Sequence, residues 1–261
     1  INIFVYRKIP NIKQLLNQSF LVVLSLLPFT LFAPIGYFWA SSLEEGSVSY
    51  LGYSQSFSGF LSVATGMGIA IVSFPNLVDE FAKGNRSAAL YKFELTLRYV
   101  LLISIFCAAA FISLRIPILT LLYKRGSFTD EAVIKLANVI PWYLVSAIFI
   151  AALNLLRTLF YSKGKFKHIA ILGIGMPIVF FVLSGFLKGV FSLVGIGVAN
   201  AVSFALLFFL SIIFIKDKEN KFLSVKLLFF IIKNGFISIF AGYVVFYSFS
   251  WILNFTFPII A

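Results

Sequence analysis

The stretch Val190–Ile215, VFSLVGIGVANAVSFALLFFLSIIFI, decides the fold class of this 261-residue chain. It runs for 26 residues without a charged side chain, and about 20 mostly apolar residues are enough for a helix to cross a bilayer. A helix satisfies its own backbone hydrogen bonds, which lipid cannot do. The apolar residues run on with little of the alternation that is typical of a membrane barrel. The stretch therefore predicts a transmembrane helix.

The rest of the chain has the same character. Hydrophobic residues make up 61% of it and charged residues 11%, whereas a soluble domain has about 25% charged residues. We therefore predict an all-α integral membrane protein with about seven transmembrane helices. The predicted spans are Phe20–Trp39, Tyr50–Phe74, Tyr99–Leu114, Val139–Phe160, Ile169–Leu187, Val190–Ile215 and Leu227–Trp251.

One predicted span and one segment between spans are unusually short. The third span is short as written, and we expect it to extend back through Leu95 and Arg98. The apolar stretch Ile116–Tyr123 is too short to cross a bilayer. This stretch is either an interfacial or re-entrant helix or a buried loop segment.

The distribution of Lys and Arg predicts the orientation. One set of span ends carries 16 of the 21 basic residues, in the ranges 7–13, 83–98, 157–167 and 216–233. Because positive residues are retained in the cytoplasm, we place residue 1 in the cytoplasm and residue 261 outside, as an odd number of spans requires. The net charge of +12 is explained by a cytoplasmic surface that faces anionic lipids. No basic domain or motif suggests a nucleic-acid partner.

The polar residues give no support for catalysis or metal binding. A single cysteine, Cys107, and a single histidine, His168, exclude an internal disulfide and leave a Cys/His metal cluster without ligands. The acidic residues lie in loops or at span ends, so no acid–base site is indicated. We expect a protein that is not an enzyme, without cofactor or metal. The chain starts at Ile1 without a signal peptide, and we expect a fragment that lacks its N-terminal part.

A few polar or small residues inside the spans allow two interpretations each. Arg157 lies one turn after Asn154 on the same helix face. The guanidinium either reaches the cytoplasmic headgroups or faces a polar cavity and meets an anionic substrate. Small residues of the second span, including Gly59, Gly66 and Gly68, indicate either close helix packing or a smooth cavity wall.

Four blocks of sequence resemble the MurJ (MviN) family of lipid II flippases. Residues 40–49, ASSLEEGSVS, followed by Tyr53, are similar to the family motif that joins its seventh and eighth spans. SFPNL at 73–77 resembles the end of the eighth span, GSFT at 126–129 a periplasmic loop, and FYS at 160–162 the end of the tenth span. The blocks occur in the family's order, and the chain corresponds to spans seven to thirteen.

The resemblance implies one lobe of a two-lobe flippase fold plus one additional helix. Residues 1–17 would be a cytoplasmic lead-in, 18–216 a six-helix C-terminal lobe, and 217–261 a cytoplasmic loop with a groove-type transmembrane helix. The implied function is translocation of lipid II, an undecaprenyl-diphosphate-linked peptidoglycan precursor, across the bacterial cytoplasmic (inner) membrane by alternating access. Membrane lipids and other cell-wall synthesis proteins are the further partners expected. The alternatives are a polysaccharide or multidrug exporter of the same (MOP) superfamily and a non-transporting membrane scaffold.

The resemblance also implies where a substrate cavity would lie. Arginine suits a diphosphate because it offers paired hydrogen bonds to phosphate oxygens. Many members carry an Asp-Arg pair where this chain has Gly36 and Tyr37, and an Arg where it has Ser56. A cationic cavity contributed by the missing half would favour the flippase, and an acidic, proton- or sodium-coupled site would favour the exporter. The expected cavity residues are Tyr53, Ser54, Gln55, Ser56, Asn154 and Arg157.

Overall fold

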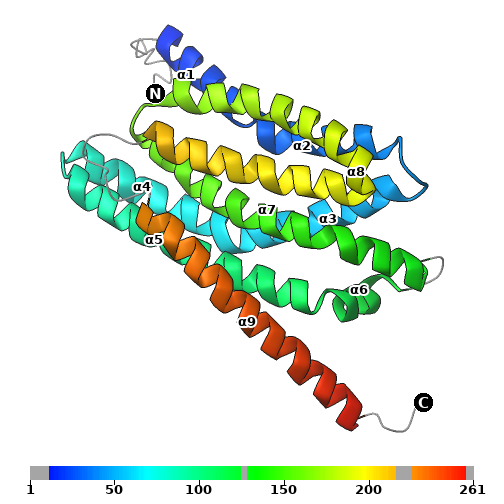
Figure 1. The fold of residues 1–261 in the computed structure, drawn as a ribbon. Helices are drawn as coiled ribbons and strands as arrows, with labels where there is room; N and C mark the ends of the chain where they lie inside the picture. Colours follow the sequence, from blue (N-terminus) through cyan, green and yellow to red (C-terminus); the bar gives the residue numbers. More distant parts are fainter. Residues whose placement is uncertain (1–11, 125–127, 216–224, 257–261) are drawn as a thin grey trace, which may run out of the picture.

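The computed structural model describes residues 12–124, 128–215 and 225–256. Within these ranges the chain is helical and has no β-strand (Figure 1). The elements are α1 (Ile12–Ser25), α2 (Leu27–Ala40), α3 (Ser47–Ser62), the π-helix η1 (Val63–Met67), α4 (Gly68–Ala82), α5 (Arg86–Ser113), α6 (Arg115–Tyr123), α7 (Asp130–Ser162), α8 (Phe166–Ile215) and α9 (Val225–Thr256). The prediction of an all-α fold is confirmed.

Six helical segments of the described ranges are long and apolar enough to cross a membrane. The longest, α8, has 50 residues and would be about 75 Å long if straight, more than twice the roughly 30 Å of hydrocarbon. It bends back at Ser192, where φ is 52° and ψ is −133°. Figure 1 shows its two arms, yellow-green and gold, running side by side. Counting these arms separately gives seven crossing segments, in agreement with the sequence.

Helix α7 forms the centre of the bundle. It packs against α8, α3 and α5, and also against α4, α6 and η1. Its inner face contributes large buried side chains such as Tyr143, Leu144 and Phe160 to the core. Helix α9 packs against α5, and its C-terminal part stands away from the bundle (Figure 1).

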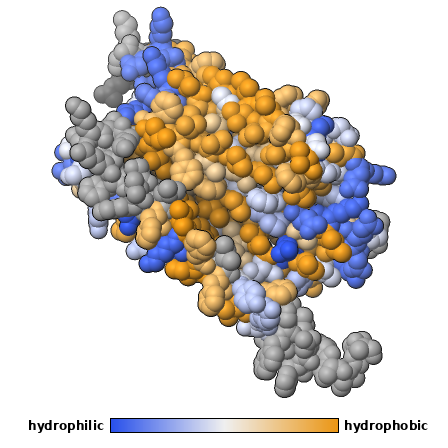
Figure 2. Space-filling model, in the orientation of Figure 1, coloured by the Kyte–Doolittle hydropathy of each residue, from blue (hydrophilic) through white to orange (hydrophobic). Residues whose placement is uncertain are grey.

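The surface shows the distribution expected of a membrane protein. In Figure 2 an apolar belt covers the middle of the bundle, and hydrophilic side chains gather at its two ends. The turn between α4 and α5 and the turn between α7 and α8 lie at one end, whereas the α2–α3 connection, α6 and the bend of α8 lie at the other (Figure 1). The chain is therefore a multi-pass membrane protein.

Several helix boundaries differ from the predicted ones, and one predicted extension is confirmed. Helix α1 begins at Ile12, inside the segment 1–17 predicted as a lead-in. Helix α5 begins at Arg86, so the third span does extend back through Leu95 and Arg98. The stretch Ile116–Tyr123 belongs to a short helix. The break in α8 falls at Ser192, a few residues after the predicted one, because the first arm continues through Lys188. The predicted orientation places residue 1 in the cytoplasm and residue 261 outside, and both residues lie outside the described ranges.

The π-helix marks the closest approach between the second span and α7. A Cβ atom on Gly66 would lie 2.6 Å from Cα of Ala151, so only glycine allows this packing. The preceding residue, Thr65, accepts a hydrogen bond of 2.7 Å from Ser104 of α5. π-Helical turns are frequent at functional sites. For Gly66 close packing is the correct interpretation, whereas Gly59 and Gly68 would have nothing within 4 Å of an added Cβ.

Candidate functional site

A partly open pocket of about 240 Å³, lined by apolar and neutral polar side chains, lies between α2, α3, α7 and α8. Phe32 and Phe204 form part of its aromatic wall, with 4.5 Å between their ring centres. Behind them Phe180 stacks on Phe32 at 4.4 Å. Hydroxyl and amide groups from three helices supply its polar atoms. The lining residues are Pro28, Phe29, Phe32, Ala33, Gln55, Ser58, Gly59, Ser62, Tyr143, Ile150, Asn200 and Phe204. None of these side chains is charged.

Gln55 is the expected cavity residue that lines this pocket. The Tyr37 hydroxyl donates a hydrogen bond of 2.9 Å to Oε1 of Gln55, which orients the amide. An added Cβ on Gly36 would lie 3.8 Å from Nε2 of Gln55, an ordinary van der Waals distance, so alanine would also fit at this position.

Oδ1 of Asn200 on α8 has no hydrogen-bond partner among the described residues. The Tyr143 hydroxyl on α7 has Gln55 as its side-chain hydrogen-bonding neighbour. Both side chains are almost fully buried, with 2% of the surface of Tyr143 and 3% of that of Asn200 exposed. In a folded protein most buried polar atoms have a partner, so Asn200 is the unusual residue of this pocket.

Arg157 lies beside this pocket, separated from it by one aromatic ring. Its guanidinium carbon is 4.3 Å from the centre of the Phe29 ring, and Phe29 also lines the pocket. Its Nη2 donates a hydrogen bond to Oδ1 of Asn154. Its Nε is buried without a hydrogen-bond partner, and within the described ranges it forms no ion pair with a carboxylate.

The other three expected wall residues lie on different faces of α3. Ser54 is fully buried and donates to the backbone oxygen of Tyr50 at 2.8 Å. Ser56 is exposed and donates to the backbone oxygen of Gly52 at 3.0 Å. Tyr53 packs against Tyr123 of α6, with 4.6 Å between ring centres. Consecutive helical residues are about 100° apart, so four in a row do not form one wall. Of these four residues Gln55 alone lines this pocket, and their assignment to a substrate cavity stays a prediction.

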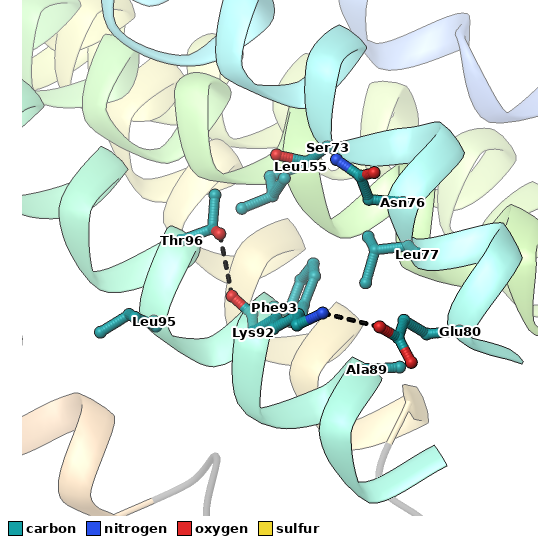
Figure 3. Close-up of a pocket in the computed structure, with 10 residues that line it drawn as sticks. All are labelled: Ser73, Asn76, Leu77, Glu80, Ala89, Lys92, Phe93, Leu95, Thr96 and Leu155. Carbon is teal, nitrogen blue, oxygen red and sulfur yellow. Dashed lines mark hydrogen bonds and ion pairs between the residues drawn. The ribbon is translucent and has the colours of Figure 1, made fainter. Parts of the chain in front are cut away.

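A second pocket, of about 250 Å³, lies between α4 and α5 (Figure 3). Leu77, Phe93 and Leu155 form its apolar part, and Asn76 and Thr96 lie on its rim (Figure 3). An ion pair of 2.6 Å joins Glu80 and Lys92 across it. This pair is drawn as a dashed line in Figure 3. The Lys92 side chain is 61% exposed, so water or lipid headgroups reach this charge directly.

Tyr143 and Asn200 were not among the site residues predicted from the sequence. Asn200 had a detectable signal, because it is the sole amide in the uncharged run Val190–Ile215 and polar side chains inside spans are costly in lipid. Tyr143 had none, since a tyrosine close to Pro141 and Trp142 also suits a membrane interface. Its position in the core depends on how α7 is rotated.

Comparisons with known proteins agree with the fold. A family model described as "Lipid II flippase MurJ" matches residues 2–261. Two curated relatives are named "Probable lipid II flippase MurJ". The one from Rhizobium meliloti (strain 1021) is 27% identical over 103 residues, which is 40% of this chain and 19% of the relative. The one from Buchnera aphidicola subsp. Acyrthosiphon pisum is 27% identical over 119 residues, 44% of this chain and 23% of the relative.

Two solved structures share the fold. A lipid II flippase MurJ in an inward closed conformation superposes with a TM-score of 0.66 and 17% identity, covering 90% of this chain and 52% of that chain. A multidrug resistance MATE family transporter of the MOP superfamily, in an outward-facing conformation, gives 0.62 and 17%, covering 87% and 52%. The chain thus spans about half the length of the solved proteins that it matches.

Proposed function

Because the chain belongs to the MurJ family of lipid II flippases, we propose that it forms one lobe of a protein that moves lipid II across the bacterial inner membrane. The observation that carries the proposal is the family match along residues 2–261, which leaves almost no part of the chain outside the family. The partners would be the undecaprenyl-diphosphate-linked precursor, the surrounding membrane lipids and other proteins of cell-wall synthesis.

The interior of the lobe supports this function over the alternative of a cation-coupled exporter. A proton- or sodium-coupled site needs a titratable or negatively charged group at the membrane interior. The pocket between α2, α3, α7 and α8 is lined by neutral side chains, and the charge beside it is the guanidinium of Arg157. A cation that forms no ion pair with the described residues suits a phosphate-bearing substrate. The MATE transporter shares the fold, and at 17% identity this likeness concerns the fold alone.

Complementation tests the proposal. The full-length protein that contains this chain would be expressed in a bacterium depleted of its own lipid II flippase, and lipid II exposed on the outer leaflet would be measured. Wild type is compared with Arg157→Ala and Ser56→Arg. Arg86→Ala is the matched control, because Arg86 is exposed at the start of α5, away from the pocket.

The outcomes separate the three functions considered. Restored exposure with wild type and with Arg86→Ala, but not with Arg157→Ala, supports a flippase in which Arg157 serves the substrate. Restoration by Ser56→Arg alone indicates the flippase fold with a different native cargo. If every well-expressed version fails, the exporter and the non-transporting scaffold are the better explanations.

A further inference from the structure

The pocket between α4 and α5 carries two charges of opposite sign. Glu80 of α4 and Lys92 of α5 point toward each other across it (Figure 3), with 2.6 Å between Oε1 and Nζ. Among the described residues that line the pocket, these two are the charged ones, so the charges of the lining sum to zero. A ligand that itself carries one positive and one negative charge would match both poles of the pocket.

The ion pair keeps the capacity for further hydrogen bonds. Lys92 donates to Oε1 of Glu80 at 2.6 Å, and Nδ2 of Asn85 donates to Oε2 at 3.4 Å. A lysine ammonium has three N–H donors, and a carboxylate oxygen can accept more than one hydrogen bond. A phosphate beside Lys92 and an ammonium beside Glu80 would therefore add charge-assisted hydrogen bonds without breaking the pair. The four groups would form a square of alternating charges.

The walls below this pair are apolar. Leu77 of α4, Phe93 of α5 and Leu155 of α7 form them (Figure 3). The volume of about 250 Å³ is just below the roughly 300 Å³ at which pockets for complete small ligands begin. The pocket would thus take one part of a larger molecule. A charged rim above apolar walls suits the part of a lipid where the headgroup meets the acyl chain.

The outer face of α5 places this pocket near the surface of the bilayer. Leu95 lines the pocket and is exposed. Tyr91 and Tyr99 lie one turn before and one turn after it, on the same face of the helix, and both are exposed. Tyrosines gather at the membrane–water interface. The α4–α5 turn next to the pocket also lies at one end of the bundle (Figure 1), so the pocket is at the depth of the lipid headgroups.

We infer that this pocket binds phosphatidylethanolamine, a phospholipid whose headgroup carries a phosphate and a primary ammonium. The phosphate would accept hydrogen bonds from Lys92, the ammonium would donate to Glu80, and the start of an acyl chain would lie against Leu77 and Phe93. An anionic lipid without the ammonium would bring its phosphate close to the carboxylate of Glu80. Phosphatidylcholine is also zwitterionic, but its quaternary ammonium has no hydrogen to donate. This lipid is distinct from the substrate of the proposed function, and the inference does not rest on that function.

The test compares three phospholipids that share the same acyl chains. Binding of phosphatidylethanolamine, phosphatidylcholine and phosphatidylglycerol to the full-length protein is titrated by native mass spectrometry. The variants are Glu80→Gln and Lys92→Gln, each of which removes one charge with little change in shape. Asp79→Asn and Lys13→Gln are the matched controls, because both residues are exposed and neither lines the pocket. The unfolding temperature without added lipid shows whether each variant is folded.

In wild type we expect phosphatidylethanolamine to bind about tenfold more tightly than either other lipid, the lower end for a hydrogen bond to a charged group. Glu80→Gln should reduce the ratio of phosphatidylethanolamine to phosphatidylcholine affinity to about one. Lys92→Gln should weaken phosphatidylethanolamine binding about tenfold. Both controls should keep the wild-type affinities.

A structural role of the ion pair alone would not change the preference between two zwitterionic lipids. Equal wild-type affinity for phosphatidylethanolamine and phosphatidylcholine would therefore overturn the inference. A preference that survives Glu80→Gln, or that Asp79→Asn removes as well, would also overturn it, as would equal losses in Lys92→Gln and Lys13→Gln. Glycerophosphoethanolamine, the headgroup without acyl chains, should not displace the lipid. Displacement would show that the apolar walls hold no acyl chain and would exclude a lipid as the occupant.

Discussion

The guanidinium carbon of Arg157 lies 4.3 Å from the centre of the Phe29 ring, and the same ring forms part of the wall of the neutral pocket. The Phe29 ring therefore separates the guanidinium of Arg157 from the pocket that neutral side chains line. An arginine stacks on a ring and donates in a plane, whereas a lysine is a compact charge. The contact with Phe29 therefore favours arginine over lysine at position 157.

Arg157→Lys should impair the protein although it retains the charge. The lysine would lose the planar stacking on Phe29 and the geometry of the hydrogen bond to Asn154. We expect outer-leaflet exposure of lipid II to fall about three- to tenfold, in line with the loss of one cation–π contact. Arg86→Lys, at an exposed position, is the control. Wild-type exposure with Arg157→Lys would show that charge alone matters at this position.

Gly66→Ala should destabilise the bundle, whereas Gly68→Ala should not. A Cβ on Gly66 would lie 2.6 Å from Cα of Ala151, and a Cβ on Gly68 would have nothing within 4 Å. Overpacking of this kind costs about 1–3 kcal/mol, and an unobstructed Gly-to-Ala change in a helix is favourable. The measurement is thermal unfolding in detergent. Equal melting temperatures for the two variants would contradict the close contact between η1 and α7.

Ser192→Gly should raise the melting temperature. Ser192 has a φ of 52°, which is costly for a residue with a Cβ and nearly free for glycine. We expect a gain of about 1 kcal/mol. Ser211→Gly is the control: it introduces the same residue within the second arm of α8 and should lower stability, because glycine is a poor helix former. A drop with both variants would argue against the bend at Ser192.

The ion pair of the second pocket should contribute little to stability. Lys92 and Glu80 are 2.6 Å apart, but the lysine side chain is 61% exposed. Exposed pairs contribute less than about 1 kcal/mol. A double-mutant cycle with Lys92→Ala and Glu80→Ala, read by thermal unfolding, should give a coupling energy below that value. The coupling should shrink further at high salt, and a large, salt-resistant coupling would point to a buried pair.

Cysteine labelling would test the orientation predicted from the basic residues. In a background without other cysteines, Cys107 is replaced by serine and a single cysteine is introduced in place of Lys83 or Lys188. These residues lie at opposite ends of the bundle, in the α4–α5 turn and near the bend of α8. A membrane-impermeant maleimide should label the cysteine at 188 in intact cells, and the one at 83 after lysis only. The reverse pattern would invert the topology.

The helices could be predicted from the sequence because each apolar run has to satisfy its own backbone in lipid. The same reasoning found the extended α5, since Leu95 and Arg98 continue the helix toward the turn that precedes it. It also found two spans in α8. It missed the start of α1 at Ile12, because a polar first turn resembles a loop in hydropathy.

The site was harder to predict, because it depends on how each helix is rotated about its axis. The family resemblance indicated the segment 53–56 of α3, and one of its residues, Gln55, lines the pocket. Its neighbours Ser54 and Ser56 bond to their own helix. Tyr143 of α7 and Asn200 of α8 line the same pocket, although they lie far apart in sequence. No local pattern reports such a meeting, and a single buried amide such as Asn200 is the strongest hint that a sequence offers.

The bend of α8 has a consequence for biosynthesis. Between Gly185 and Gly197 the chain has one charged residue, Lys188, and the two arms are so close that a Cβ on Gly195 would clash with the backbone of Leu187. No hydrophilic loop has to be translocated, so the arms can leave the translocon together as a preformed hairpin and partition into lipid as one unit. Substitutions that widen this bend should reduce the amount of protein that reaches the membrane, and leave the turnover of each inserted molecule unchanged.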